Sequence, residues 1–232
     1  MSRGEHLLQE QHGTTKKASS FYENQMLNYL NDKMTEFISN QSMMFIATSD
    51  SRGNCDSSFR AGSIGFVRVI DDKTLIYPGY KGNGVMASLG NIIENPHIGL
   101  MFIDFFEYCI GLHVNGKASI LENGQLSSLK MTEKIKKDIK EKEGNRPERW
   151  VLIKVDEAYI HCSKHIPKLE KMDKKIYWGT DDEKQKGGIS LKQNKVKKIK
   201  NNIHLSGAIL KQELCFFFMF RAIFLNKRRD YS

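Results

Sequence analysis

The order of apolar and polar positions along the chain first predicts one amphipathic helix. In residues 21–40 the apolar side chains recur at helical spacing: Tyr22, Met26, Leu30, Met34, Phe37 and Ile38. Beyond this segment the helical period is lost. Six shorter apolar or alternating runs are typical of β-strands: residues 43–50, 64–71, 74–78, 97–105, 109–121 and 150–162.

Short turns join several of these strands. The Asp-Asp-Lys sequence at residues 71–73 connects two of the runs as a hairpin, and a second pair of runs follows in the same way. Short helices are expected at residues 85–95, just before Pro96, and within the charged stretch 125–143. Because the strands follow one another through turns and not through regular helical crossovers, the pattern predicts a mainly β, α+β fold. We expect an antiparallel sheet or barrel with short peripheral helices.

Composition separates the chain into three parts. Residues 1–20 are polar and are expected to form a flexible N-terminal extension, whereas residues 21–183 carry the strand pattern of a folded domain. Residues 184–232 hold 12 of the 36 lysines and arginines and 2 of the 27 acidic residues, which leaves 24 basic and 25 acidic side chains before them. The main body is therefore nearly neutral, and a nucleic-acid function of the folded domain has no electrostatic support.

The basic tail also contains an apolar and aromatic stretch, residues 207–225. Lys211, Glu213 and Arg221 interrupt it, and Arg221 lies well inside the stretch. A charge at that depth makes a lipid-spanning helix a poor fit. We expect residues 184–232 to be a poorly ordered or appended segment that does not contact a membrane.

The four cysteines are scattered through the chain, at positions 55, 109, 162 and 215, and they form no CxxC pair. The N-terminal residues lack an apolar core of signal-peptide length. This combination is typical of free thiols in a reducing compartment. We therefore expect a cytoplasmic protein.

The stretch YPGYKGNGV, residues 77–85, is the first candidate site. It follows a predicted strand and precedes a predicted helix, and it contains three glycines and Lys81. Such a loop allows backbone N–H groups, a helix N-terminus and an ammonium group to meet one phosphate. It matches neither the P-loop nor the dinucleotide-binding glycine pattern. From spacing alone it is either a phosphate site or an ordinary turn.

Arg60 lies a few residues before the strand that pairs with the strand entering this loop. In such a hairpin Arg60 and Lys81 are expected to approach each other. An anion between the two cations would relieve their repulsion, and an arginine can bind phosphate through two parallel N–H bonds. A solvent-exposed arginine without a ligand is the alternative.

The sequence HCSKH, residues 161–165, places His161, Cys162 and His165 close together. Two histidines four residues apart can bind zinc when they share a helix. Here they end a predicted strand, and no further Cys or His lies at ligand spacing, so we predict no metal site. Neither a Ser-His-Asp triad nor a pair of hydrolytic carboxylates is visible, and no catalytic side chain is assigned.

A longer series of motifs resembles a known family. Within residues 25–180 these are, in order, FRAGSIGFVRVIDDKTLIYPGYKGNGVMASLGNIIENPHIGLMFIDF, GLHVNGKASI and AYIHCSKHI. They resemble the pyridoxamine 5′-phosphate oxidase-related proteins, and more closely the branch of flavin-nucleotide-binding proteins. The resemblance implies an FMN-binding split β-barrel that forms a homodimer, with FMN in the groove between the subunits.

The resemblance also implies which residues meet the cofactor. The backbone that lines the flavin ring falls on Gly65, Phe66 and Val67. The strand end and basic loop that hold the FMN phosphate fall on Tyr77, Pro78, Lys81, Gly82 and Asn83. Just upstream, the expected partners of the phosphate or the ribityl chain are Arg60 and Ser63. The side chain expected to face the flavin of the other subunit is that of His113.

Two departures from the family pattern bear on activity. Gly84 stands where relatives tend to carry a second basic residue, and the C-terminal segment that binds pyridoxal phosphate in the vitamin B6 oxidases has no counterpart. The resemblance thus implies a flavin oxidoreductase that transfers hydride or electrons through flavin N5, with NAD(P)H or another small molecule as partner. The alternatives are a non-catalytic flavin carrier or sensor, and a haem protein with an axial histidine among His113, His161 and His165.

Overall fold

The computed structural model describes residues 2–172, 174–180, 182 and 185. The apolar stretch 207–225 and nearly all of the predicted basic tail lie outside the described residues, so the expectations for them stay predictions. Within the described part of the chain no helix is both long and apolar enough to cross a membrane. The three cysteines that it contains, Cys55, Cys109 and Cys162, are free thiols.

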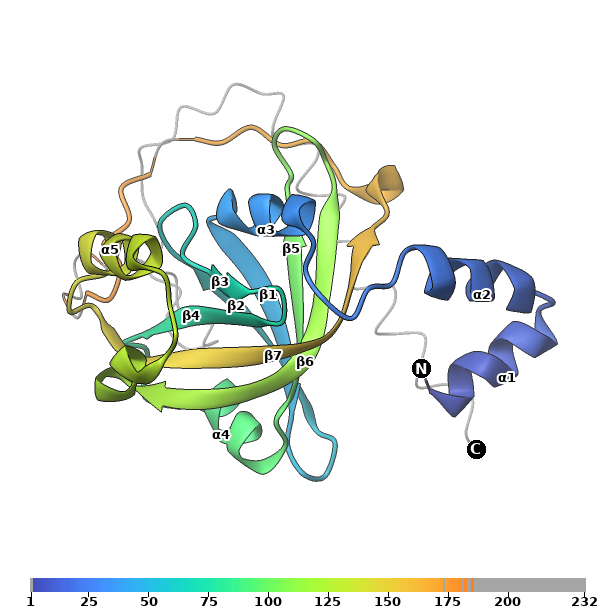
Figure 1. Ribbon diagram of the computed structural model, residues 1–232, viewed down its shortest axis with the longest axis horizontal. Coiled ribbons are helices and arrows are strands. Elements are labelled where there is room, and N and C mark those ends of the chain that lie inside the picture. Colours follow the sequence, from blue (N-terminus) through green and yellow to red (C-terminus); the bar gives the residue numbers. More distant parts are fainter. Residues whose placement is uncertain (1, 173, 181, 183–184, 186–232) are drawn as a thin grey trace, which may run out of the picture. The chain divides into compact units, whose positions relative to one another are not determined.

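A seven-stranded sheet forms the centre of the fold and curls around the core (Figure 1). Its strands are β1 (Met43–Ser49), β2 (Cys55–Ala61), β3 (Arg68–Asp71), β4 (Thr74–Tyr80), β5 (His97–Ile103), β6 (Gly111–Glu122) and β7 (Pro147–His161). Their order across the sheet is β2-β1-β5-β6-β7-β4-β3, and every neighbouring pair is antiparallel. The prediction of a mainly β, antiparallel fold is confirmed.

Short helices surround this sheet. The described ones are α1 (Arg3–Gln11), α2 (Thr15–Asn24), α3 (Asp32–Ser39), α4 (Ala87–Glu94) and α5 (Glu133–Lys142), with the 3₁₀ helices η1 (Asn123–Ser128) and η2 (Ser163–His165). Figure 1 shows α3 and α4 at opposite ends of the curled sheet. The helices predicted at residues 85–95 and 125–143 correspond to α4 and to η1 with α5.

Alternation along the strands places the main core on the inner face of the sheet. In β5, for example, Ile98, Leu100 and Phe102 are buried, whereas the residues between them are partly exposed. Met34 and Ile38 of α3 close one end of this core. Burying one such side chain contributes about 1.5–3 kcal/mol, so the alternating pattern determines which face of each strand turns inward.

The single helix predicted over residues 21–40 is wrong, because this segment contains the end of α2 and all of α3 with a non-helical link between them. In the link, Leu27 exchanges two backbone hydrogen bonds with Ala158 of β7. Leu30 N–H donates to a carbonyl oxygen of the β3–β4 turn at 2.7 Å, and the side chain of Asn31 then caps α3. These partners are remote in sequence, so helical spacing does not reveal them.

Within the predicted N-terminal extension, residues 1–20, the chain forms α1 from Arg3 onward and then the first part of α2. A capping box begins α1: Ser2 Oγ accepts from Glu5 N–H at 3.1 Å, and Glu5 Oε2 accepts from Ser2 N–H at 2.6 Å. The hydroxyl of Tyr22 in α2 donates to Glu5 Oε1 at 3.1 Å and joins the two helices. Neither helix buries a residue, which is why the apolar pattern did not predict α1 or the start of α2.

The sequence pattern also missed β2 and began β3 too early. β2 pairs with β1 along its whole length, but its residues are polar or partly exposed, so its hydrophobic pattern is weak. Residues 62–67 are a loop in which Gly65 has a φ of +76°, a conformation that favours glycine. Phe66 and Val67 turn from this loop into the core before β3 begins.

Gly116 lies at a bulge where β6 passes β7, and a Cβ there would overlap the carbonyl oxygen of Lys154. We expect Gly116→Ala to lower the free energy of unfolding by about 2 kcal/mol or more, because the ladder between the two longest strands must shift. Gly124→Ala is the matched control, since its Cβ would meet no atom within 4 Å. Chemical denaturation checks this, and equal stability of the two variants would contradict it.

Candidate functional site

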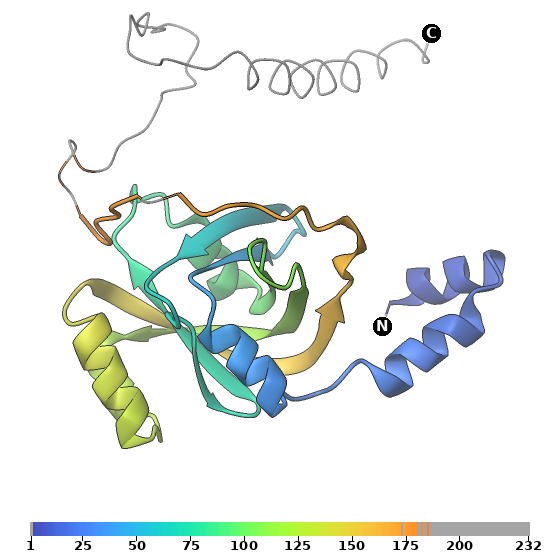
Figure 2. The same ribbon diagram turned by 90° about the horizontal axis from the view of Figure 1, so that it is seen from above.

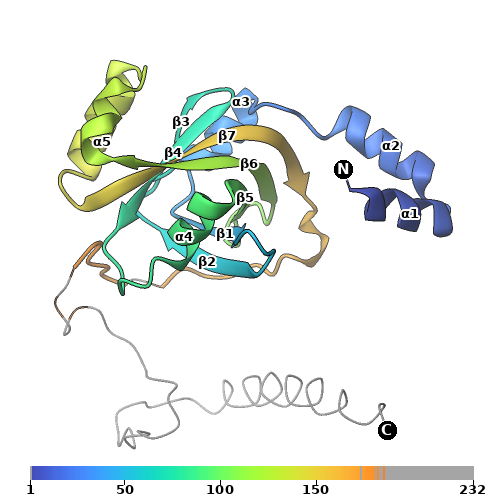
Figure 3. The same cartoon turned by 90° about the horizontal axis from the view of Figure 1, so that it is seen from below.

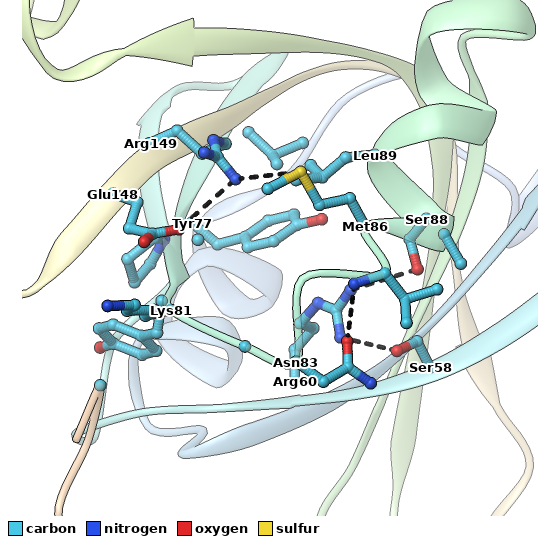
Figure 4. Close-up of a pocket in the computed structure, with 18 of the residues that line it drawn as sticks. Ser58, Arg60, Tyr77, Lys81, Asn83, Met86, Ser88, Leu89, Glu148 and Arg149 are labelled. Carbon is cyan, nitrogen blue, oxygen red and sulfur yellow. Dashed lines mark hydrogen bonds and ion pairs between the residues drawn. The ribbon is translucent and has the colours of Figure 1, made fainter. Parts of the chain in front are cut away.

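A cavity of about 790 Å³ opens where β2, the end of β4, the loop after β4 and the start of α4 meet (Figure 4). α4 packs against β1, β2 and β6 (Figure 3). Its first residues form one side of the cavity. The start of β7 and residues 177–179 complete the wall. Figure 2 shows how the chain after β7 runs back along the sheet. Residues 177–179 of this returning segment are the ones that line the cavity.

The glycine-rich loop leaves open space in front of its backbone. A Cβ added at Gly82 or Gly84 would meet no atom within 4 Å, and Gly84 has a φ of +81°. Asn83 Oδ1 accepts from the N–H of Val85 at 3.0 Å and shapes the turn. Met86, with a φ of 54°, then begins α4 without a side-chain cap from the described residues. The first N–H groups of α4 therefore lie at the cavity wall without an intrahelical acceptor, as an anion site requires.

Arg60 reaches the cavity from β2, so the predicted approach through the β3–β4 hairpin is wrong. Its Nη1 donates to Ser58 Oγ at 2.6 Å, and its Nη2 donates to Ser88 Oγ at 3.2 Å. Ser88 in turn donates to Asp56 at 2.9 Å. These bonds hold the partly buried guanidinium at the wall, which argues against a freely solvated arginine.

The ring of Tyr77 lies between the Arg60 side of the cavity and the Lys81 side (Figure 4). Burial raises the pKa of its hydroxyl to about 12, although the neighbouring Arg60 acts in the opposite direction. The hydroxyl is therefore neutral at ordinary pH. The Tyr77 side chain therefore gives the cavity an uncharged aromatic wall with one polar end.

Lys81, Glu148 and Arg149 gather on the other side of the cavity (Figure 4). Arg149 Nη1 is 3.6 Å from Glu148 Oε2 and 3.9 Å from the sulfur of Met86. With Arg60 and Asp56 included, three basic and two acidic side chains line the wall. The charge balance and the free helix N-terminus both favour an anionic ligand.

The predicted site residues divide into two groups. Those that line the cavity are Arg60, Tyr77, Pro78, Lys81, Gly82 and Asn83. Those that lie outside its lining are Ser63, Gly65, Phe66 and Val67. Phe66 and Val67 fill the core, and Gly65 packs so closely on Ser39 that a Cβ would lie 2.9 Å from its carbonyl oxygen.

The model of the pyridoxamine 5′-phosphate oxidase family matches residues 30–162, which is more than half of the chain. The chain belongs to this family. The matched residues include all seven strands, and they contain α4 and the glycine-rich loop. A comparison with curated proteins finds no matching sequence.

The solved structures that match this chain are only distantly similar to it in sequence and in fold. HupZ from Group A Streptococcus is 24% identical, with 55% of this chain and 90% of that one covered and a TM-score of 0.42. A putative pyridoxamine 5′-phosphate oxidase from Lactobacillus delbrueckii is 19% identical, with 58% and 98% covered and a TM-score of 0.42. An FMN-binding protein from Syntrophomonas wolfei is 17% identical, with 66% and 96% covered and a TM-score of 0.41.

Among the cavity residues that were not predicted from the sequence are Ser88, Arg149 and Trp178. Ser88 carried a usable signal, because a serine in the first turn after a glycine-rich loop is well placed to meet a phosphate. Arg149 reaches the site only because its position in β7 pairs with Gly79 of β4. Trp178 arrives through the long return of the chain after β7, which no local pattern indicates.

The histidines singled out in the sequence form a separate cluster on neighbouring strands. His113 Nε2 and His161 Nδ1 are 2.9 Å apart, and the ring of His113 stacks on Tyr159 at a centroid distance of 4.7 Å. His161 ends β7 while His165 lies in η2, so the two do not share a helix. None of these residues lines the cavity at the glycine-rich loop.

Burial lowers the pKa of His113, and the nearby His161 lowers it further. As the pH falls, the unfolded chain therefore binds this proton before the folded chain does. We expect thermal stability to be retained above the ordinary histidine pKa of about 6.5 and to decrease as the pH falls below it. Melting curves at pH values from about 7 down to about 5.5 measure this.

His113→Phe keeps a ring against Tyr159 and removes the titrating group. It should lose less stability than the wild type over the same pH range. His12→Gln, at an exposed position between α1 and α2, is the control and should follow the wild type. Identical pH profiles for the wild type and His113→Phe would contradict the assignment.

Proposed function

We propose that this protein is an FMN-binding flavoprotein that acts as an oxidoreductase. The observation that carries the proposal is the cavity at the glycine-rich loop, where Arg60, Lys81 and the N-terminus of α4 line one space. Its volume of about 790 Å³ lies within the usual range of cofactor pockets, about 300–1,000 Å³. Membership of the pyridoxamine 5′-phosphate oxidase family supports a flavin as the ligand.

The residues present fit the two ends of FMN. The glycine-rich loop runs from Lys81 on one side of the cavity to Asn83 beside Arg60 on the other (Figure 4). The phosphate would lie against this loop and would be held by Lys81, Gly82, Asn83, Ser88 and Arg60, which offer cations, a hydroxyl, an amide and unobstructed backbone. Tyr77 and Pro78 would line the apolar part of the ligand. The proposed contacts of Ser63 and of residues 65–67 lie outside this cavity and rest on the family resemblance.

Bound FMN supplies hydride or electron transfer at its N5 atom, and the protein supplies binding and orientation. Arg60 is well suited to orientation because Ser58 and Ser88 already fix its guanidinium. The neutral Tyr77 hydroxyl adds no charge beside the ligand. The free thiols of the described cysteines are consistent with a cytoplasmic location, which we propose as well.

Replacement of Arg60 and Lys81 by alanine tests the placement of the phosphate. A hydrogen bond to a charged group contributes about 1.5–3 kcal/mol, so each replacement should raise the Kd for FMN about tenfold or more. The Kd for riboflavin, which lacks the phosphate, should change little. Lys117→Ala, at an exposed position of β6 outside the cavity, is the control. An unchanged Kd for FMN in the double variant, measured by titration, would refute this placement.

The same purified protein distinguishes an enzyme from a flavin carrier or sensor. Under anaerobic conditions, NADH or NADPH should bleach the bound flavin at catalytic rates if the protein is an oxidoreductase. A flavin that stays oxidised with these and other small-molecule reductants supports the alternative role, that of a non-catalytic flavin carrier or sensor. The fold and the cavity are the same in both cases.

The pair formed by His113 and His161 favours haem as a second candidate ligand, because imidazole nitrogens are common axial ligands. This pair lies outside the proposed flavin cavity. The absorption spectrum of the protein separates the two candidates: a Soret band that disappears in His113→Ala supports haem. Flavin bands alone refute it.

The outer face of the sheet carries a row of largely apolar side chains across five strands. Cross-strand pairing aligns, in order, Phe59, Phe45, Met101, His113 and Tyr159. The first two are 53% and 37% exposed, and their rings are 5.5 Å apart. An exposed aromatic surface of this kind is typical of protein contacts, and we propose it as the homodimer face.

Phe59→Glu should convert the proposed dimer into a monomer, because it places a charge on this face without touching the core. Leu7→Glu, at a comparably exposed apolar position in α1, is the control and should stay dimeric. Light scattering coupled to size exclusion measures the mass. A wild-type chain that is monomeric at every concentration contradicts the proposal.

A further inference from the structure

Glu143, directly after α5, is a fully buried carboxylate: its side chain is 0% exposed. A buried charge is costly unless it is paired and hydrogen-bonded. Glu143 Oε1 accepts from Arg68 Nη1 at 2.8 Å, and Oε2 accepts from the hydroxyl of Tyr80 at 2.6 Å. Both oxygens are therefore used, one by a residue of β3 and the other by the last residue of β4.

Arg68, the charged partner of Glu143, is itself held firmly. Arg68 is 5% exposed, and it also donates to Phe66 O at 2.8 Å and, through Nε, to Asp138 Oδ2 at 3.1 Å. Its guanidinium lies 5.9 Å from the ring centre of Trp150 in β7. Through Arg68, Glu143 is thus linked to β3, α5 and β7, and neither residue lines the cavity.

Tyr80 connects this buried pair to the candidate phosphate site. It ends β4 and directly precedes Lys81, the first residue of the glycine-rich loop. Burial raises the pKa of the Tyr80 hydroxyl, and Glu143 raises it further, so the hydroxyl stays protonated and donates its hydrogen. The ring also stacks on Trp178 of the cavity wall, at a centroid distance of 6.2 Å and an angle of 23°.

The backbone alone holds the end of β4 weakly. The register with β7 shifts between Gly79 and Tyr80, and Tyr80 is opposite Pro147, which has no N–H to donate. After Tyr80 the loop is exposed as far as Met86, and it contains two glycines, whose backbone has the largest conformational freedom. The side chain of Tyr80 therefore anchors the strand side of the loop.

We propose that Tyr80 and Glu143 are positioning residues that set the phosphate loop and so select phosphate-bearing FMN over riboflavin. This inference rests on the proposed function of the cavity. The hydroxyl of Tyr80, held by Glu143, fixes the residue from which Lys81 extends. Without that hydrogen bond the unbound loop adopts more conformations, so ordering it on binding costs more conformational entropy. This cost lowers the affinity for the phosphate end of the ligand.

Tyr80→Phe tests the inference, because it keeps the ring on Trp178 and removes only the hydroxyl. We expect the Kd for FMN to rise about tenfold, the effect of one hydrogen bond to a charged group, and the Kd for riboflavin to stay within about twofold. Tyr22→Phe is the matched control, since it removes another tyrosine–glutamate hydrogen bond that lies outside the cavity. Its ratio of the two Kd values should equal that of the wild type.

Glu143→Gln gives a second variant at the other end of the bond and should lower the preference for FMN in the same direction. If both Kd values rise by the same factor in Tyr80→Phe, or neither changes, the positioning role is refuted and the bond is only structural. That result leaves the phosphate placement supported if Arg60→Ala and Lys81→Ala still weaken FMN. A wild-type protein that binds neither flavin refutes the proposed function and the inference together.

Discussion

The pairing of β6 with β7 is the constraint on which the rest of the structure depends. These are the two longest strands, and they join β2-β1-β5 on one side of the sheet to β4-β3 on the other. Arg60 lies on β2 and the glycine-rich loop follows β4, so no direct strand pairing brings them together. They line one cavity only because the sheet curls about this central ladder. The bulge beside Gly116, where β6 closely approaches Lys154, is part of that curl.

Rigid and adaptable parts meet at the end of β4. On one side lies the buried pair of Arg68 and Glu143, whose hydrogen bonds reach Phe66 in the loop before β3 and Asp138 of α5. Such a pair contributes little net stability, because desolvation offsets much of the attraction, but it defines one geometry. On the other side lies an exposed loop with Gly82 and Gly84, which leaves backbone free to approach a ligand. Tyr80 joins these two parts.

The composition of the cavity agrees with a cofactor protein in which the ligand carries the chemistry. Its arginines are engaged with neighbours: Arg60 with two serines, and Arg149 with Glu148. Tyr77 is kept neutral by burial. These groups are suited to holding and orienting an anion, and family membership supports our proposal that this anion is the phosphate of a flavin. Because Gly84 stands where the family resemblance leads us to expect a second cation, the proposed phosphate binding would depend more on Arg60, Lys81 and the start of α4.

Local sequence determined the features that depend on local physics. The β3–β4 turn, the strands β5 and β7, and the glycine-rich loop before α4 were all predicted, because periodicity and turn chemistry act within a few residues. Only the tertiary structure decided how these pieces meet. It broke the expected first helix by pairing Leu27 with Ala158, and it placed Phe66 and Val67 in the core. It also brought Arg60 to the cavity from β2 and joined Tyr80 to Glu143, because partners so far apart in the chain leave no local pattern.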